Sequence, residues 1–260
     1  MGRRLPDNHF LNPTLARIYD VTCGWSEDYD FYLSLANRPH MDILDLGCGT
    51  GLLCDAYAGR GHTVVGVDPA QAMLDEAAKK PNGGVIDWVQ GYAQDFASER
   101  RFDLIVMTGH AFQTLLDESD VRQVFSVVRQ HLKDNGRFAF ESRNPRLDWA
   151  GKWHGRTAEW ESDQGRFSQA TRVMHASGDT LTFEHTYQFS DQRLDSISTL
   201  RFLSRSRIEE LLVESGLSVT DLYGDWDTSP FDEASSPEMI FVTSPQETTR
   251  QQACSGRRHM

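Results

Sequence analysis

The sequence is poor in the features that mark membrane-spanning and exported proteins. No apolar run approaches the 18 residues that a membrane-spanning helix needs, and the mean hydropathy of the chain is −0.51. Arg3 and Arg4 lie near the start, but no apolar segment follows them, so no secretory signal is visible. We therefore expect a cytoplasmic protein that does not enter a membrane.

Cysteine and positive charge are scarce as well. The cysteines form no C-x-x-C pair and have no histidine at metal-ligand spacing, which argues against a metal site and a disulfide framework; they are Cys23, Cys48, Cys54 and Cys254. The 38 acidic residues outnumber the 26 basic ones and give a net charge of −12 at pH 7. Because a protein that follows phosphates needs a basic face, we expect no nucleic-acid partner.

One stretch of the chain organises the rest. An apolar run from residue 43 enters a turn with glycine at alternating positions, Gly47, Gly49 and Gly51. A second apolar run, at 63–67, ends in Asp68. Glycine permits the positive φ of a sharp turn from strand to helix and lets a ligand lie against bare backbone. Asp68 would stand beside a ribose, so this unit predicts that the protein binds a nucleoside.

The residues around the glycines distinguish between nucleoside ligands. A dinucleotide-binding turn has its third glycine where this chain has Leu52, which argues against a nicotinamide-dependent oxidoreductase. Asp45 stands two residues before Gly47. A carboxylate there would repel a pyrophosphate but would suit a ligand that carries an ammonium and a sulfonium group.

With this leading acid, these glycines and this ribose acid, residues 40–145 resemble the class I S-adenosylmethionine-dependent methyltransferases. The resemblance implies an α/β fold with a doubly wound, seven-stranded, mostly parallel sheet, and S-adenosylmethionine as the cofactor. It places Asp45 and the glycine loop, including the small residue Cys48, against the cofactor. It also suggests that Tyr19 or Trp25 borders the cofactor or the substrate and that Met73 packs on the adenine, with plain core packing as the alternative for each.

The apolar pattern divides the chain into four parts: a helical lid at 1–40, the cofactor-binding core at 41–147 and 204–244, an antiparallel β insertion at 148–203, and a mobile tail at 245–260. In the first and second parts we predict strands at 43–46, 63–67, 85–89, 102–107, 137–141, 218–223 and 239–243. Residues 12–37 are predicted to be helical, with Asn12 as cap, Pro13 first and a second short helix that carries Tyr29, Tyr32 and Leu33. The other predicted helices cover 52–60, 69–80 with Pro69 first, 119–133, and 206–216 with a capping box at Ser206.

Candidate site residues follow the third and fourth strands, where open α/β folds place their ligands. Asp95 and Phe96 would supply an acceptor and a flat apolar wall for adenine. We expect Thr108 to contact the cofactor and its loop to face the methyl group. His110 is the candidate general base for a hydroxyl acceptor, and the alternative is a histidine that only shapes the pocket.

The insertion has the alternating pattern of strands. Gly178 and Asp179 predict a two-residue hairpin turn between strands at 167–176 and 180–189, and a further strand is expected at 194–203. The insertion would either cover a small methyl acceptor or pair two copies of the chain in a homodimer. Three tryptophans near its start could wall the acceptor pocket: Trp149, Trp153 and Trp160. His154 and His185 in the insertion are alternatives to His110 as the general base.

These observations predict an S-adenosylmethionine-dependent methyltransferase that transfers a methyl group to a nitrogen or oxygen atom of a small molecule. Two alternatives stay open at this point. One is a catalytically silent module that binds the nucleoside cofactor, and the other is a NAD-dependent oxidoreductase.

Overall fold

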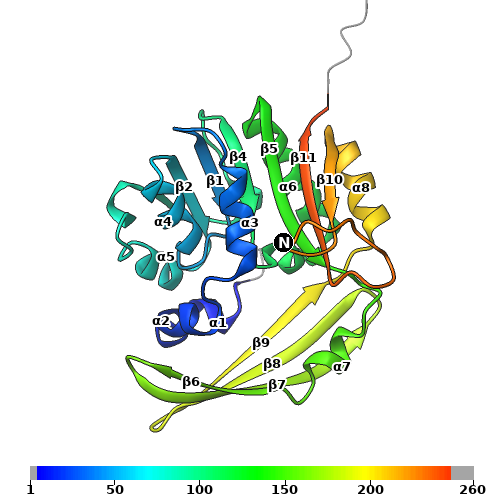
Figure 1. Cartoon of the computed structure of the whole chain (residues 1–260). Helices are drawn as coiled ribbons and strands as arrows, with labels where there is room; N and C mark the ends of the chain where they lie inside the picture. The colour runs from blue at the N-terminus through cyan, green and yellow to red at the C-terminus, as the bar shows by residue number, and fades with distance from the viewer. Residues whose placement is uncertain (1–4, 247–260) are drawn as a thin grey trace, which may run out of the picture.

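A computed structural model of the chain describes residues 5–246 and places a seven-stranded sheet at its centre (Figure 1). The strands are β1 (Asp42–Leu46), β2 (Thr63–Asp68), β3 (Asp87–Gln90), β4 (Phe102–Met107), β5 (Leu132–Arg143), β10 (Leu217–Tyr223) and β11 (Glu238–Pro245). Their order across the sheet is β10, β11, β5, β4, β1, β2, β3. The first five are parallel, and β11 is antiparallel to both of its neighbours. The predicted doubly wound, mostly parallel sheet is confirmed.

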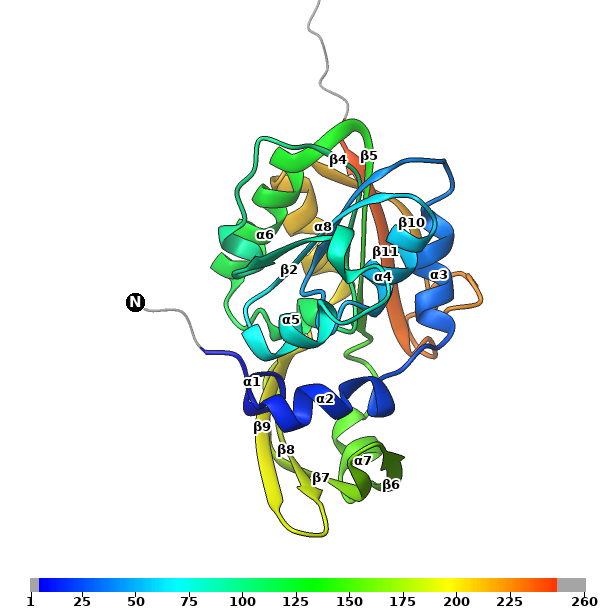
Figure 2. The ribbon, with the colours of Figure 1, turned by 90° about the vertical axis from the view of Figure 1, so that its left-hand side faces the viewer.

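Helices cover both faces of this sheet (Figure 2). Residues of α3 (Glu27–Leu35) and α4 (Leu52–Gly59) share one buried cluster, and residues of α6 (Glu118–His131) and α8 (Arg205–Glu214) share the other. Strand β4 is a continuous apolar run that is buried on both sides, as a central parallel strand must be. Within residues 5–246, no helix combines the length and apolar character that crossing a membrane requires.

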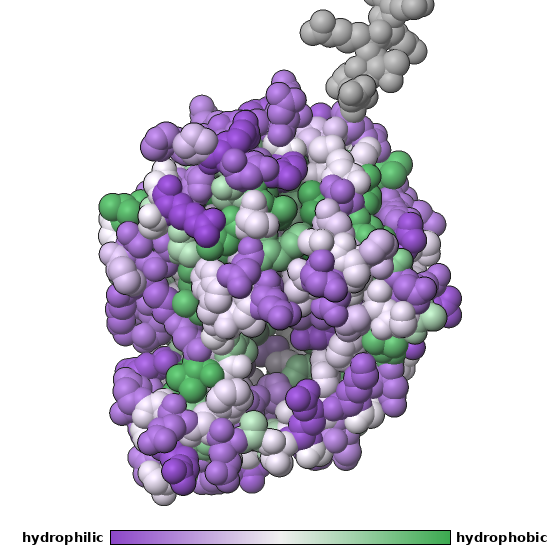
Figure 3. Space-filling view, in the orientation of Figure 1, coloured by the Kyte–Doolittle hydropathy of each residue, from purple (hydrophilic) through white to green (hydrophobic). Residues whose placement is uncertain are grey.

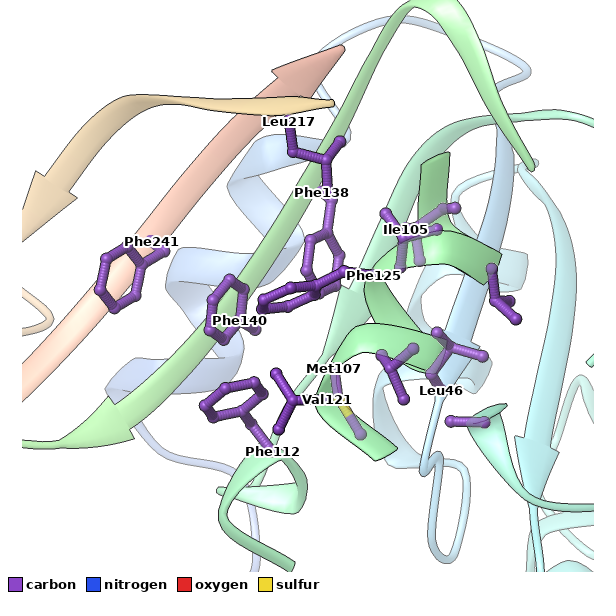
Figure 4. Close-up of a cluster of buried hydrophobic side chains, with 14 of the residues drawn as sticks. Leu46, Ile105, Met107, Phe112, Val121, Phe125, Phe138, Phe140, Leu217 and Phe241 are labelled. Atoms are coloured by element: carbon purple, nitrogen blue, oxygen red, sulfur yellow. The ribbon is translucent and has the colours of Figure 1, made fainter. Parts of the chain in front are cut away.

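A stack of phenylalanines fills the face that α6 covers (Figure 4). The ring centroid of Phe140 lies 4.7 Å from that of Phe112, 4.9 Å from that of Phe138 and 5.0 Å from that of Phe241. Burial of each such ring contributes about 1.5–3 kcal/mol. Because Phe112 belongs to the short helix η3 (Ala111–Thr114), which directly follows His110, this core holds the loop after β4 in place.

The insertion forms a separate antiparallel sheet under the carboxyl ends of the core strands (Figure 1). Helix α7 (Trp149–Trp153) precedes its strands, which are β6 (Thr157–Ser162), β7 (Gly165–Ser177), β8 (Thr180–Gln188) and β9 (Arg193–Arg201). The hairpin turn at Gly178 and Asp179 is present as predicted, with Ser177 opposite Thr180. Strand β6 was not predicted, because Trp160 is its only large apolar residue.

Helices α1 (Asn8–Leu11) and α2 (Pro13–Thr22) lie between the two sheets (Figures 1 and 2). Leu15 and Ile18 pack on the insertion, and Ala16 packs beside α5 (Gln71–Ala77). Asn12 caps α2 as predicted, with its Oδ1 accepting the Thr14 N–H at 2.9 Å. This segment therefore joins the insertion to the core.

The helical segment predicted over 12–37 divides into α2, which ends at Thr22, and α3, which begins at Glu27 and is the predicted second short helix. Gly24 explains the break. A Cβ at this position would lie 2.6 Å from the carbonyl oxygen of Asp20, so the chain can turn this tightly only at a glycine.

Two predicted helix starts are wrong. Helix α5 begins at Gln71 and not at Pro69, because the Asp68 carboxylate accepts the Ala70 N–H and holds that residue extended. Helix α8 begins at Arg205, with Ser204 as its cap. The predicted capping box at Ser206 is therefore displaced by two residues.

The remaining differences are small shifts of element ends. The third strand begins after the short helix η1 (Gly83–Val85), and β5 begins at Leu132, directly where α6 ends. The helix end predicted at residue 133 is therefore too late. Strand β11 extends to Pro245, and residues 247–260 of the predicted tail lie outside the described residues.

Candidate active site

The glycine loop joins β1 to α4 at the carboxyl edge of the sheet. Gly47 and Cys48 donate their N–H groups to the carbonyl oxygen of Val67, at 2.7 and 3.0 Å, which ties the loop to the end of β2. The φ angles of Gly47, Gly49 and Gly51 are 81°, 54° and 72°. Because side chains with a Cβ rarely adopt such angles, the loop needs glycine at all three positions.

The three glycines differ in what surrounds them. A Cβ on Gly51 would lie 2.6 Å from the Trp88 ring, and a Cβ on Gly47 would lie 3.0 Å from Ala111. Among the described residues, a Cβ on Gly49 would meet only Tyr19, at 4.0 Å. Gly47 and Gly51 therefore permit close packing inside the protein, whereas Gly49 leaves room for a ligand against the backbone.

Asp45 is buried at the end of β1 with only half of its carboxylate satisfied. Its Oδ2 accepts a hydrogen bond from Sγ of Cys54 at 3.3 Å, whereas Oδ1 has no partner among residues 5–246. Burial raises the pKa of Asp45 to about 7, because the charged form loses its hydration. A cofactor that carries an ammonium group fits this orphaned acceptor, since a nearby cation would stabilise the carboxylate.

Asp68 organises the other side of the loop. Its Oδ2 accepts the Gly49 N–H at 3.0 Å, and its Oδ1 accepts the Ala70 N–H at 2.8 Å. An ionised carboxylate has about four acceptor sites, so lone pairs remain for two ribose hydroxyls. Burial raises the pKa of Asp68 to about 6. The position and the chemistry of Asp68 both suit the predicted role.

Helix α2 reaches over the glycine loop. Asp20 accepts a hydrogen bond from the Thr50 hydroxyl and forms an ion pair with Lys80. Tyr19 lies beside Gly49 and packs on the buried cluster that contains Met73. Met73 itself has no exposed surface, so in this structure it is a core residue beneath α2. Tyr19 stays a candidate for contact with the cofactor.

Cys48 and Thr108 also border the loop. Burial raises the pKa of the Cys48 thiol to about 11, so this thiol stays protonated at neutral pH and is not a nucleophile. Thr108 directly follows β4, and its carbonyl oxygen accepts the Ala111 N–H at 3.2 Å. That turn brings η3 against Gly47.

Asp95 and Phe96 are not brought into one pocket with the glycine loop. They line a groove of about 440 Å³ over β2 and β3, whose walls include neither Asp68 nor any loop glycine. The ring of Phe96 packs against His131, with 5.0 Å between centroids, and the side chain is buried in the core. Asp95 is exposed in the short helix η2 (Ala93–Asp95). Their contact with adenine stays a prediction that this arrangement does not support.

His110 lies at the centre of a buried acidic cluster. Its Nε2 lies 3.0 and 3.1 Å from the two carboxylate oxygens of Glu238, and its backbone N–H donates to Oε1 of Glu141 at 2.5 Å. The Tyr32 hydroxyl donates to the other oxygen of Glu141. His110 has a φ of 59°, a conformation that is costly for a residue with a side chain. The fold therefore holds the backbone of His110 in a strained conformation, which fixes where the imidazole lies.

Burial sets the protonation of this cluster. It lowers the pKa of His110 to about 3 and raises the pKa of Glu238 to about 7. It also raises the pKa of Glu141. Near neutral pH the imidazole is thus neutral, and Glu238 exchanges one proton with the medium. When Glu238 is ionised, the pair of Glu238 and His110 can take up a proton.

A pocket of about 120 Å³ opens beside His110, between the loop after β4, helix α1 and the inner face of the insertion. The space-filling view shows the surface hollowed between the insertion and the core (Figure 3). The pocket lining combines aromatic and aliphatic side chains with three histidines and an arginine; the main contributors are His9, His110, Arg143, Phe183, His185 and Leu200. His154 is exposed beyond α7 and takes no part in it.

The sequence reasoning missed several of these residues. Glu141 and Glu238 are acids within or beside apolar strands that are otherwise buried, and this pattern could have marked them. His9 stacks on Tyr187, and its Nδ1 lies 2.6 Å from the Tyr187 hydroxyl. No local pattern announces His9, because the contact spans 178 positions of the chain.

Comparison with known proteins supports the expectation that the chain contains a methyltransferase domain. Residues 43–136 match the family model of a methyltransferase domain. The chain is 24% identical over 204 residues to a cypemycin N-terminal methyltransferase from Streptomyces, covering 78% of this chain and 83% of that protein. It is 35% identical over 133 residues to a ubiquinone biosynthesis O-methyltransferase from Bartonella tribocorum, and this match spans about half of each chain, 49% and 51%.

A solved structure shows the same fold. The S-adenosylmethionine-dependent methyltransferase from Clostridium acetobutylicum superposes with a TM-score of 0.74 at 20% identity, over 90% of this chain and 98% of that one. The domain match and the superposition thus show that residues 43–136 carry a methyltransferase domain and that the chain has the fold of a solved S-adenosylmethionine-dependent methyltransferase.

Proposed function

We propose that the protein transfers the methyl group of S-adenosylmethionine to a nitrogen or oxygen atom of a small molecule that binds beside His110. The observation that carries the proposal is the pocket between His110 and the insertion. It adjoins the glycine loop on two sides, because Ala111 packs against Gly47 and the ring of His9 lies 5.3 Å from that of Tyr19. The names of the Streptomyces and Bartonella relatives, one an N-terminal and one an O-methyltransferase, are consistent with a nitrogen or oxygen acceptor.

The cofactor supplies a methyl carbon that is already activated by positive sulfur. The residues of the chain therefore have to align the acceptor atom, exclude water and receive one proton. We assign cofactor binding to the glycine loop with Asp45 and Asp68, and to Tyr19 and Thr108. The segment 1–40 would act as the lid over this site, and the insertion would cover the acceptor.

We assign the proton to the pair of His110 and Glu238. The neutral imidazole lines the pocket, and the Glu238 carboxylate lies within hydrogen-bond distance behind it. A proton released by the acceptor would pass through the His110 ring to the Glu238 carboxylate, which is the more basic of the two groups. Glu141 and Tyr32 would hold the loop in position. The expected cytoplasmic location and the homodimer remain predictions.

The test has two parts. The first is calorimetric titration with S-adenosylhomocysteine beside NAD, for which we expect micromolar binding of S-adenosylhomocysteine alone. The second is transfer of labelled methyl groups to panels of small amines and alcohols, and to protein and nucleic acid as comparison. Label that enters only the macromolecules would overturn the proposal of a small-molecule acceptor while leaving cofactor binding intact.

A further inference from the structure

Arg143 stands at the end of β5 with its guanidinium in the wall of the acceptor pocket. Its position is fixed on two sides. The guanidinium carbon lies 4.9 Å from the ring centroid of Trp153 and 5.6 Å from that of Trp149, and Nη1 donates to Oε1 of Gln113 at 3.0 Å. Gln113 is fully buried and donates in turn to the carbonyl oxygen of Arg201 at 3.1 Å. The cation is thus held in place before any ligand arrives.

This arginine has no counter-ion of its own. Within residues 5–246, it forms no ion pair, although Glu238 and Glu141 are near enough to act on it electrostatically. Glu238 is engaged by the His110 ring, and Glu141 is engaged by Tyr32 and the His110 backbone. Arg143 is half-buried, and a cation that has lost part of its hydration is costly unless it is paired. An anion that enters the pocket would supply the missing partner.

The surroundings of Arg143 favour one kind of anion. A planar guanidinium presents two parallel N–H groups, which match a carboxylate in a bidentate arrangement. The nearby carboxylates of Glu141 and Glu238 would repel a doubly charged phosphate more strongly than a singly charged carboxylate. The pocket of about 120 Å³ has room for a small molecule.

We infer that the methyl acceptor is a small carboxylic acid whose carboxylate binds Arg143 while its nitrogen or oxygen nucleophile lies beside His110. The inference rests on the proposed function and deepens it, because it names the substrate class of the same pocket. The aromatic rings of Phe183 and His185 on the insertion would contact the part of the acceptor between these two ends.

The first experiment compares acids with their carboxamides. The protein loaded with S-adenosylhomocysteine is titrated with glycine, β-alanine, anthranilate and salicylate, and with the carboxamide of each. We expect at least one acid to bind about 30-fold or more tightly than its carboxamide, since removal of one partner of a desolvated charge pair costs about that much. Absence of any such preference in the wild-type protein overturns the inference.

The second experiment uses variants. Arg143→Gln should abolish the preference for the acid, and Arg143→Lys should restore part of it, because an ammonium keeps the charge but not the bidentate geometry. The matched control is Arg146→Gln, which removes an exposed arginine that pairs with Glu233 outside the pocket and should leave the preference unchanged. An acid preference that survives in Arg143→Gln would show that another group binds the carboxylate.

The two proposals fail in different ways. If S-adenosylhomocysteine does not bind to the wild-type protein, the proposed function fails. If it binds with equal affinity to the wild-type protein and to Arg143→Gln, the cofactor site and the fold of the variant are intact, and any loss of acid binding belongs to Arg143 itself.

Discussion

The buried carboxyl of Asp45 lowers the free energy of unfolding of the cofactor-free protein. Its carboxyl is fully enclosed, one oxygen lacks a partner in the described part of the chain, and the thiol of Cys54 is its only hydrogen-bond donor. A residue of this kind is retained at a functional site when a ligand compensates for it. Stability and cofactor affinity should therefore respond in opposite directions to its removal.

We expect Asp45→Asn to stabilise the cofactor-free protein at pH 8 by about 2 kcal/mol or more. The pKa of Asp45 is about 7 in the folded protein and near 4 when unfolded. Between these values the unfolded chain ionises first, so the stability of the wild type falls as the pH rises, and the penalty is complete above pH 7. Denaturant titration at pH 4 and pH 8 measures the difference, which should be small at pH 4.

The same variant should bind S-adenosylhomocysteine less tightly, because it lacks the charge that faces the ammonium group. Asp75→Asn is the control, since Asp75 is exposed on α5 and its side chain accepts a hydrogen bond from Nε2 of Gln71 at 2.8 Å. A variant Asp45→Asn with unchanged stability at pH 8 and unchanged affinity would remove this residue from the site.

The pair of Glu238 and His110 predicts a pH dependence of the rate. Glu238 must be ionised to support proton uptake, and its pKa is about 7, so kcat should rise with pH through about 7. Other ionisable groups also act electrostatically on the pair: Glu141, Arg143, Tyr32, Asp28 and Asp225. In Glu238→Gln the rise should disappear and kcat at pH 8 should fall about a hundredfold.

Initial rates between pH 5.5 and pH 9 at saturating substrate test this expectation. Glu233→Gln, at an exposed acid that pairs with Arg146, serves as the matched control and should keep the wild-type profile. A pH profile that is the same in Glu238→Gln as in the wild type would assign the ionisation to a group other than Glu238 and overturn this role.

At the scale of the element, the start of α8 offers a direct comparison of two neighbouring serines. Ser204 Oγ accepts the Arg207 N–H at 3.3 Å, whereas Ser206 lies inside the first turn. Ser204→Ala should therefore lower the free energy of unfolding by about 0.5–2 kcal/mol, the usual cost of losing an N-cap, and Ser206→Ala should change it much less. Thermal or denaturant unfolding of the two variants checks this, and equal losses would restore the cap predicted from the sequence.

Element ends show where sequence reasoning stops. The pattern Ser206-Arg-Ile-Glu209 satisfies the capping-box rule, but Glu209 instead accepts a hydrogen bond from Arg205, at 2.7 Å. The apolar periodicity over 12–37 continues across the break at Gly24, since packing on both sides of the break uses the same residue types. The local pattern predicts that a strand or helix is present, whereas the residues at which it begins and ends depend on partners that lie elsewhere in the chain.

At the scale of the whole molecule, the sheet and the glycine loop could be predicted because their information is local. Alternating glycines, an acid at each strand end and buried apolar runs need no distant partner to be recognised. The acceptor pocket is different. It joins His9, His110, Arg143 and His185, which come from helix α1, the loop after β4, the end of β5 and the insertion, so only the three-dimensional arrangement brings them together.

The net charge of the molecule predicts that it does not bind DNA. With a net charge of −12, the protein should not bind a labelled DNA duplex at low salt, because non-specific binding depends on the release of counterions by basic side chains. Fluorescence anisotropy measures this over a protein range that reaches about 10 µM. Binding that weakens steeply with added salt would contradict the expectation and reopen a nucleic-acid substrate.

The contacts of the N-terminal segment bear on the order in which ligands bind and leave. Asp20 holds α2 to Thr50 beside the glycine loop, while the His9 N–H donates to Ser196 Oγ on the insertion at 2.8 Å. One short segment of chain thus contacts both the glycine loop and the insertion. If this segment moves to admit ligands, the cofactor would bind before the acceptor, and both products would leave only after the segment opens. The opening of the segment, and not methyl transfer, would then limit kcat.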